Sequence, residues 1–533
     1  MDTLTSARPR VLVADPTAAV GIEMLQNHGL QVDVNTGLDR QALIEVIPAY
    51  DALIVRSETK VTAEVLAAGS QLKVVARAGV GVDNIDLDAA TQLGIMVVNA
   101  PGGNTVSAAE HTIAMILALA RHIPQAHDSL HVGEWKRSRF MGVEVRGKTL
   151  SCLGLGRIGR EVARRAQGLD MQVIAYDPYI SAEYAGHLRV DLVSFETALS
   201  QADFITVHLP KTDGTAGLLD AETLAMTKPG VRIVNCARGG IVNERALLAA
   251  LDSGQVAGAA LDVFDQEPLP ADSPLLTHPR IIVTPHIAGS TVEAQDQVAI
   301  DVAEQVVDVL AGRPARYAVN APLLAPHDLP FLTPYIDLGE RLGRLAVQLG
   351  GANLEAVDIT YSGALVEHDL SSVTAAVIKG MLERVIDVRV NLINAARLAG
   401  QRGLLVSERK THGTSQDETL ITVTVANGQG PRNVSGALVQ GEPHIVGLDD
   451  MWVDFPARGH VLLTRHHDRP GIIGRIGTLL GNADINISFM HVGRRSPRGE
   501  AIMVVGVDEP IPEDLYDSIK EVSYTYWVQA VTL

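Results

Sequence analysis

Residues 154–159 form a glycine pattern whose spacing suits the binding of a pyrophosphate. The segment Gly154-Leu155-Gly156-Arg157-Ile158-Gly159 follows an apolar run at 149–153 and precedes a helical pattern. In such a loop the first glycine permits a tight turn, the second lets the backbone approach a pyrophosphate, and the third allows close helix–strand packing. Free amides at the helix N-terminus then face the phosphates. The pattern predicts a dinucleotide-binding loop.

A carboxylate follows this loop at the distance expected for a ribose ligand. Asp177 lies about twenty residues beyond the loop, after the next predicted strand. A carboxylate there accepts hydrogen bonds from both ribose hydroxyls and repels a 2′-phosphate, which favours NAD over NADP. Because Pro178 follows, the residue is also compatible with a simple turn.

Three later stretches each end a predicted strand, which is where open α/β sheets bind ligands. These stretches are 235–240, 262–268 and 284–289. They contribute Arg238, Glu267 and His286. Such a set suits hydride transfer from a 2-hydroxy acid, because a histidine can take the hydroxyl proton and a carboxylate can stabilise the charged imidazole. A guanidinium can bind the substrate carboxylate with two hydrogen bonds.

Each of these residues alone has an ordinary structural explanation. His286 is compatible with a satisfied histidine at a strand end, Glu267 with a solvated turn, and Arg238 with a surface charge. Their shared position at strand ends after a dinucleotide loop favours the catalytic interpretation.

The elements that position these residues alternate between apolar runs and helical patterns, which is typical of βαβ units and parallel sheets. The expected strands are 10–14, 52–55, 73–76 and 96–99 in a first block, then 149–153, 172–176, 204–208, 232–236, 257–262 and 281–284 in a second. A helix over 104–121, with Ser107 and Glu110 spaced as a capping box, would connect two lobes. A helix over 291–310 stops at 311–314.

The second half of the chain changes character. The proline-rich stretch 321–334 predicts a linker, and a mixed region to about 456 shows helical patterns at 335–349 and 372–399 and a strand near 420–425. The tail has a β-α-β-β-α-β order, which is ferredoxin-like. Its expected elements are 459–465, 470–482, 486–493, 500–507, 512–521 and 524–532.

Composition excludes several classes of protein. The 533 residues suggest three or four domains, and a net charge of −18 argues against general binding to nucleic acid or an anionic membrane. Two cysteines make no disulfide framework, and the 17 histidines show no metal-ligand spacing. No apolar run is long enough to span a bilayer, and the N-terminus has no signal-peptide pattern. A soluble, cytoplasmic protein without a metal is therefore expected.

Several segments carry a family resemblance. They are 77–86, 135–142, 154–159, 236–240, 262–268 and 285–286, with Asp468-Arg469-Pro470-Gly471 and Asn486-Ile487 in the tail. The segments 154–159, 236–240, 262–268 and 285–286 are similar to the D-2-hydroxyacid dehydrogenase family, while 77–86 and 135–142 are part of a longer match. Across nearly the whole chain the sequence resembles the long-form D-3-phosphoglycerate dehydrogenases of that family, and the tail resembles an ACT regulatory domain.

The resemblance implies four parts. They are a substrate-binding lobe at 1–104 completed by 291–320, an NAD-binding Rossmann domain at 105–290, an intervening regulatory domain at 321–456 and an ACT domain at 457–533. The implied fold class is α/β, with two Rossmann-like doubly wound lobes, a mixed α/β domain and a ferredoxin-like domain.

The resemblance also implies roles for individual residues. Arg238 would bind the substrate carboxylate, and His286 would be the acid/base group partnered by Glu267. The implied NAD-binding residues are Gly154, Gly156, Arg157, Ile158, Gly159, Asp177, His208, Pro210, Thr215, Cys236, Ala237, Arg238, Asp262, His286, Ala288 and Gly289.

Substrate-binding roles follow from the same resemblance. The implied residues are Arg56, Ser57, Arg77, Gly79, Val80, Asn104 and Arg137. Arg56 and Arg77 would bind the phosphate end, although both are also compatible with exposed strand-end arginines. Arg137 and Arg139 would reach the site of a neighbouring subunit.

The tail departs from its relatives at one position. His466 stands two residues before Asp468, where close relatives often have tyrosine. If the tail binds L-serine, Asp468 and Asn486 remain available for its amine and carboxyl groups, while His466 would alter affinity or make it pH-sensitive. The alternative is a stable interface domain without a ligand.

The implied activity is NAD-dependent oxidation of 3-phospho-D-glycerate to 3-phosphohydroxypyruvate, the first step of the phosphorylated route to L-serine. Inhibition by L-serine, side reduction of 2-oxoglutarate, and a homotetramer (with a dimer as second choice) are further expectations. Other family members reduce glyoxylate, hydroxypyruvate or 2-oxoglutarate, and transcriptional corepressors of the family use the same fold to sense NAD. An ACT-like tail favours the enzyme, because it suits amino-acid feedback.

Overall fold

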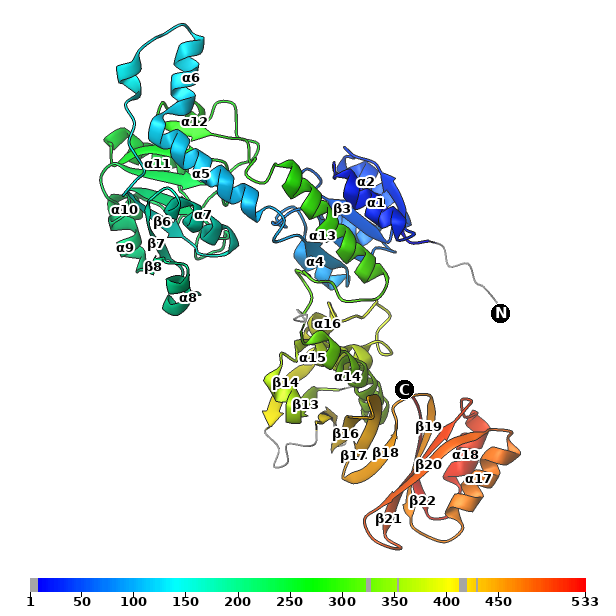
Figure 1. The fold of residues 1–533 in the computed structure, drawn as a ribbon. Coiled ribbons are helices and arrows are strands. Elements are labelled where there is room, and N and C mark those ends of the chain that lie inside the picture. The colour runs from blue at the N-terminus through cyan, green and yellow to red at the C-terminus, as the bar shows by residue number, and fades with distance from the viewer. Residues whose placement is uncertain (1–7, 323–326, 352–353, 412–418, 428–429) are drawn as a thin grey trace.

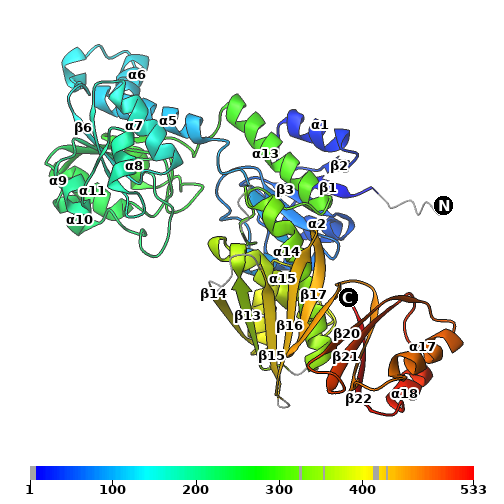
Figure 2. The same ribbon diagram turned by 60° about the horizontal axis from the view of Figure 1, so that its bottom comes forward.

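The computed structural model describes residues 8–322, 327–351, 354–411, 419–427 and 430–533. Four parts follow one another along a branched, elongated molecule, with the second lobe and the C-terminal part at opposite ends (Figures 1 and 2). Within the described residues, no helix is both long and apolar enough to cross a membrane. The same residues contain no group of three or more His, Cys, Asp or Glu side chains that could hold a metal ion.

The first lobe is a parallel sheet of five strands in the order β2-β1-β3-β4-β5. The strands are β1 (Arg10–Val13), β2 (Gln31–Val34), β3 (Ala52–Val55), β4 (Val74–Arg77) and β5 (Met96–Asn99). One face is covered by α1 (Ala19–Asn27) and α13 (Val292–Leu310), and the other by α2 (Arg40–Val46), η1 (Ile47–Ala49), α3 (Ala63–Ala68) and α4 (Leu87–Gln92). The four predicted strands are confirmed. The edge strand β2 was not predicted, because none of its residues is buried.

The second lobe is a parallel sheet in the order β12-β11-β10-β9-β6-β7-β8. Its strands are β6 (Thr149–Leu153), β7 (Gln172–Tyr176), β8 (Asp191–Leu192), β9 (Phe204–Val207), β10 (Val231–Asn235), β11 (Val256–Leu261) and β12 (Ile281–Val283). Its helices are α5 (Thr105–Arg121), α6 (Ile123–His131), η2 (Arg137–Phe140), α7 (Arg157–Gln167), α8 (Ala182–His187), α9 (Phe195–Ser200), α10 (Ala221–Ala225), α11 (Glu244–Ser253) and α12 (Pro274–Thr277). Because the strands are parallel, their carboxyl ends all meet at one edge of the sheet.

The connector helix spans Thr105–Arg121 and confirms the predicted 104–121 to within one residue, but the expected capping box of Ser107 and Glu110 is wrong. Helix α5 begins at Thr105, so Ser107 lies inside its first turn rather than at its N-cap. The Ser107 hydroxyl is 2.7 Å from the Thr291 hydroxyl, where the chain crosses back into the first lobe. Glu110 instead pairs with Arg165 of α7 at 3.2 Å.

The intervening part corrects two helix predictions. The second half of the expected linker 321–334 is helical, because α14 spans Leu329–Gly350 with Pro330 in its first turn, where a missing amide costs no hydrogen bond. The expected helix 372–399 is two helices, α15 (Ser371–Leu382) and α16 (Ala395–Gln401). Between them, Asn394 hydrogen-bonds the backbone of Arg389 and Asn391 and so competes with the helical ladder.

These helices cover one mixed sheet in the order β14-β13-β15-β16-β17-β18. The strands are β13 (Ala356–Ser362), β14 (Leu405–Thr411), β15 (Ile421–Asn427), β16 (Gly430–Val439), β17 (Glu442–Leu448) and β18 (Met451–Pro456), and η3 (Gly363–Glu367) follows β13. The strand predicted near 420–425 is confirmed as β15, while its partners were not predicted.

The tail has the predicted β-α-β-β-α-β order. It comprises β19 (His460–His467), α17 (Ile472–Asn482), β20 (Ile487–Arg494), β21 (Glu500–Val507), α18 (Glu513–Lys520) and β22 (Thr525–Thr532). The antiparallel sheet runs β20-β21-β19-β22, and both helices pack on one face. The other face joins the core around α14, so the intervening part and the tail share one apolar core.

Candidate active site

The glycine loop lies at the carboxyl end of β6, and each glycine has a separate structural reason. A Cβ at Gly154, whose φ is +96°, would crowd the His208 carbonyl, and one at Gly159 would overlap the Gly154 carbonyl oxygen. A Cβ at Gly156 would meet nothing within 4 Å. Open space beside Gly156, at the N-terminus of α7, fits a pyrophosphate against the backbone.

Asp177 lies beside this loop at the end of β7. One carboxylate oxygen accepts from the Leu155 amide and the other from the Tyr179 amide, both at 2.9 Å. The backbone thus holds the carboxylate at the place expected for a ribose ligand.

The neighbouring strand ends supply uncharged walls. Burial lowers the pKa of His208 to about 4, so this ring is neutral near pH 7. Burial, with the Asp262 carboxylate nearby, raises the pKa of the Cys236 thiol to about 12. The Thr215 hydroxyl donates to the Pro210 carbonyl at 2.6 Å and so shapes the loop after β9. These uncharged side chains are compatible with a dinucleotide, whose phosphates carry negative charge.

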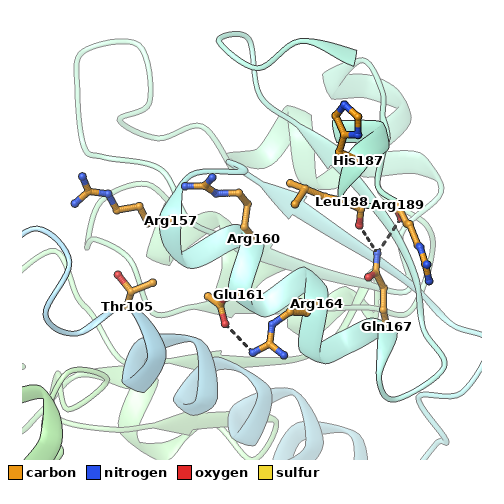
Figure 3. A pocket seen from close by; sticks show the side chains of 9 residues that line it. All are labelled: Thr105, Arg157, Arg160, Glu161, Arg164, Gln167, His187, Leu188 and Arg189. Atoms are coloured by element: carbon orange, nitrogen blue, oxygen red, sulfur yellow. Dashed lines mark hydrogen bonds and ion pairs between the residues drawn. The ribbon is translucent and has the colours of Figure 1, made fainter. Parts of the chain in front are cut away.

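A basic cleft of about 520 Å³ runs along α7 from the same loop (Figure 3). Arg157, Arg160 and Arg164 line one wall, and Thr105 and Arg189 contribute from neighbouring elements. Arg164 pairs with Glu161 at 2.9 Å. Arg157 belongs to the glycine loop itself, in keeping with its expected role beside the pyrophosphate.

The predicted catalytic pair is assembled. His286 Nδ1 lies 2.7 Å from Glu267 Oε2, and Glu267 Oε1 accepts from the Phe264 amide at 3.0 Å. Glu267 is therefore anchored to the backbone while it orients the imidazole. With Nδ1 engaged, Nε2 is the nitrogen available to exchange a proton with a ligand. The His286 side chain is 49% exposed and lines a cleft.

This cleft of about 870 Å³ lies between the two lobes. From the first lobe and the connector it is lined by the predicted residues Arg56, Ser57, Arg77, Gly79 and Asn104, and from the second lobe by Glu267, His286 and Gly289. Val80 lies beside this wall, where its carbonyl accepts from Asn99 Nδ2. Arg137 does not line the cleft and belongs to η2, after α6.

Arg56 and Arg77 line this cleft, and Arg238 lies close to Arg77 without being among the lining residues. Burial, followed by the positive charges of Arg238 and Arg56, lowers the pKa of Arg77 to about 10. Arg238 reaches from the second lobe to the first, where its Nε is 3.5 Å from the Asp83 carboxylate. Within the described residues, buried Arg77 Nε and Asn104 Oδ1 have no hydrogen-bond partner. Glu58, Asp83 and Glu267 also line the cleft and partly balance its positive charges, and the unpaired Arg77 Nε is a donor available to an anion.

Sequence reasoning missed two residues that shape the Arg56 loop. Asp15, 1% exposed at the end of β1, accepts from the Arg56 and Thr59 amides and from the Thr59 hydroxyl. Asn84 Nδ2 donates to the Arg56 and Thr59 carbonyls, both at 2.7 Å. The available signal was a carboxylate directly after the apolar run at 11–14.

The predicted regulatory residues lie in different parts of the tail sheet. Asp468 accepts from the Arg498 amide and from Arg494 Nη1, which together lower its pKa. Asn486 donates to Asp508 at the other end of the strands. Strand β21 begins at Glu500, which lies near Asp468, and ends at Val507, which lies near Asn486. At about 3.3 Å per residue, Asp468 and Asn486 are therefore roughly 23 Å apart.

His466 lies within the same sheet. Its side chain is buried, and burial lowers its pKa, so the ring is uncharged near neutral pH.

Comparison with protein-family models finds three consecutive matches. Residues 113–288 match the NAD binding domain of D-isomer specific 2-hydroxyacid dehydrogenases, and residues 331–449 match the D-3-phosphoglycerate dehydrogenase intervening domain. Residues 460–523 match the ACT domain.

Curated relatives extend over almost the whole chain. D-3-phosphoglycerate dehydrogenase from Synechocystis is 47% identical, covering 96% of this chain and 93% of that protein. The enzyme of the same name from Archaeoglobus fulgidus is 46% identical and that from Bacillus subtilis 41%, each with at least 96% of both chains covered. Among solved structures, an NAD-dependent formate dehydrogenase from Staphylococcus aureus in complex with NAD is 32% identical, with a TM-score of 0.52 over 57% of this chain and 96% of that one.

The fold, the site and these matches define an NAD-dependent dehydrogenase of the D-2-hydroxyacid type. Within that class, the chain belongs to the D-3-phosphoglycerate dehydrogenase family.

Proposed function

We propose that the protein oxidises 3-phospho-D-glycerate with NAD to 3-phosphohydroxypyruvate, at the start of the phosphorylated route to L-serine. The observation that carries this proposal is that Arg56 and Arg77 line the cleft beside His286, with Arg238 close to Arg77 and 3.5 Å from the Asp83 carboxylate of the cleft wall. A phosphorylated hydroxy acid carries about three negative charges, and an acidic protein needs local guanidinium groups to attract it.

The side chains of the cleft divide the work of the reaction. Arg238 binds the substrate carboxylate, while Arg56 and Arg77 bind the phosphate. His286 Nε2 takes the hydroxyl proton, and Glu267 stabilises the resulting imidazolium. Bound NAD supplies the nicotinamide that accepts the hydride from C2. Closure of the lobes about the two crossings, at α5 and Thr291, excludes water.

The same arginines support a weaker side activity, the reduction of 2-oxoglutarate. This molecule presents a second carboxylate where the phosphate would lie, so it meets the same positive charge. The substrates of the competing functions in this family carry no phosphate, so they would leave Arg56 and Arg77 without a ligand.

Regulation by L-serine is proposed at an interface between two tails. Asp468 and Asn486 lie too far apart in one chain to hold one small molecule, which supports a site completed by a second copy. An antiparallel pairing of two β20 edges would bring Asp468 of one chain near Asn486 of the other.

A cytoplasmic homotetramer completes the proposal. The arm from α6 to η2 exposes large apolar side chains in this single chain, which supports a second copy as its cover. These residues are Ile123, Leu130, Val132, Trp135 and Met141. The arm also carries Arg137, which could then reach the neighbouring cleft.

NADH formation from 3-phosphoglycerate, with the product trapped, tests the proposal. We expect turnover in the wild type, a fall of about 10³-fold in His286→Ala because the proton acceptor is lost, and inhibition by added L-serine.

The outcomes separate the parts of the proposal. Turnover that L-serine does not change would retain the enzyme and reject serine regulation. Tight NAD binding without turnover would reject this substrate, and other hydroxy acids would be tried next.

A further inference from the structure

We propose that His111, on the connector helix, is a positioning residue that acts through Asp262 to hold the loop carrying His286. His111 belongs to none of the sequence motifs, and its contacts form only in the folded chain. The inference rests on the proposed function where it is tested by turnover. A second test, amide hydrogen exchange of the apo protein, does not depend on that function.

The first step is the contact between the connector and the catalytic sheet edge. His111 Nε2 lies 3.3 Å from the Thr284 hydroxyl and 3.5 Å from Asp262 Oδ1. The Thr284 hydroxyl donates to Asp262 Oδ1 at 2.6 Å, because an ionised carboxylate can only accept. The Thr284 proton is thus already engaged, so His111 Nε2 must carry the hydrogen that it shares with these two oxygens.

The second step runs from Asp262 to the catalytic loop. The fully buried Asp262 carboxylate accepts from the Ile287 amide on one oxygen and from the Ala288 amide on the other, both at 2.9 Å. These amides directly follow His286, whose backbone has a φ of +52°. Such a conformation is unfavourable for a non-glycine residue and persists when surrounding contacts impose it.

The buried Asp262 carboxylate stays charged because its hydrogen-bond donors stabilise the anion. Burial works to raise the pKa of Asp262, but the hydrogen bonds from His111, Thr284 and the two loop amides outweigh burial and lower it. Removing His111 therefore weakens the anion to which the loop is bound.

The third step is the position of His111 on α5. Ser107 lies one turn earlier on the same helix face, where its hydroxyl meets that of Thr291. One face of the connector thus contacts both the returning crossing of the hinge and the base of the catalytic loop. A shift of α5 would reach His286 by this route.

The test compares three variants. His111→Leu removes the donor, whereas His111→Gln keeps an N–H group the same number of bonds from Cα. We expect kcat to fall on the order of tenfold in His111→Leu, with the KM for substrate within about twofold, and His111→Gln to recover most of the loss. His28→Leu is the matched control, because the ring of exposed His28 hydrogen-bonds the Met24 carbonyl of its own helix.

Amide hydrogen exchange of the apo protein supplies a readout independent of turnover. We expect faster exchange at Ile287 and Ala288 in His111→Leu, and wild-type exchange in His111→Gln. An active wild type with unchanged kcat and exchange in His111→Leu would overturn the inference, as would equal losses in Leu and Gln variants. An inactive wild type whose loop still loosens in His111→Leu would overturn the proposed function alone.

Discussion

At the scale of single residues, the site is a set of charges held by backbone groups. Glu267 is fixed by the Phe264 amide, Asp177 by two amides, and Asp15 by the loop that bears Arg56. Hydrogen bonds of this kind place a charge before the ligand arrives, so binding and proton transfer need little reorganisation.

Replacing Glu267 by glutamine tests the role of its charge. The amide oxygen can still accept from His286 Nδ1, but it no longer stabilises the imidazolium formed after proton transfer. We expect kcat/KM to fall by about 10²-fold, measured as NADH formation. Asp265→Asn is the control, because it makes the same charge change in the same loop, and an equal loss in both variants would contradict the assignment.

The buried guanidinium of Arg77 predicts an alkaline limit to substrate binding. Its pKa of about 10 lies below the ordinary value of 12.5, so the free protein loses this positive charge as the pH rises through 10. Between about pH 10 and 12.5 the unfolded chain binds more protons at Arg77 than the folded protein does. The free energy of unfolding contributed by Arg77 therefore rises with pH over this range, because deprotonation removes a destabilising buried charge.

We expect the KM for 3-phosphoglycerate to climb above about pH 10, because binding favours the charged guanidinium. In Arg77→Met the KM should already be high at pH 8 and should change less with pH. A KM that rises equally in both proteins would assign the limit to another group.

At the scale of elements, the carboxyl ends of parallel strands gather the site. Strands β6, β7, β9, β10, β11 and β12 each end at a residue or loop expected to bind NAD or carry a catalytic group. The glycine loop between β6 and α7 must be both tightly packed and open to a ligand. Gly154 and Gly159 permit the tight packing, and Gly156 leaves space for the ligand.

Two alanine substitutions in this loop separate folding from cofactor binding. In Gly159→Ala the new Cβ would overlap the Gly154 carbonyl, so we expect a loss of about 1–3 kcal/mol of stability. In Gly156→Ala the apo melting temperature should stay near wild type while the KM for NAD rises at least about tenfold, because the methyl group fills the space for the pyrophosphate. Thermal melting without NAD and NAD titration measure both effects, and matching behaviour of the variants would refute the distinction.

At the scale of the whole molecule, the intervening part connects the tail to the first lobe. It shares an apolar core with the tail, and it touches the first lobe through polar contacts. Asn391 Nδ2 donates to the Gly94 carbonyl at 2.6 Å, Arg389 to the Leu72 carbonyl at 3.3 Å, and Arg397 pairs with Asp88 at 2.8 Å. The tail and the intervening part should therefore move together as one unit. Their motion relative to the first lobe should occur at these polar contacts.

Two adjacent leucines in β19 test the shared core. Leu462 and Leu463 are both fully buried, but Leu462 faces the tail helices and Leu463 faces α14. Each alanine variant should lose about 2–5 kcal/mol of stability. In hydrogen exchange, Leu463→Ala should loosen α14 while Leu462→Ala loosens α17 and α18. Identical exchange patterns would mean that the two faces do not belong to separate cores.

The sequence alone determined the features that rest on local patterns. The glycine loop, the strand ends bearing Arg238, Glu267 and His286, and the order of the tail all follow from short-range periodicity and turn residues. The Pro-containing start of α14 and the Ser107 capping box were wrongly predicted, because tertiary packing and an earlier helix start overrode these local signals.

Which distant side chains meet depends on the tertiary fold. Arg238 of the second lobe comes close to Arg77 and Asp83 of the first because two sheets present their carboxyl ends to one cleft. The roughly 23 Å between Asp468 and Asn486 follows from strand register. His111 reaches Asp262 across 151 residues of sequence because α5 packs under the catalytic edge. Contacts of this kind depend on how whole elements pack, and no local pattern of residues encodes that packing.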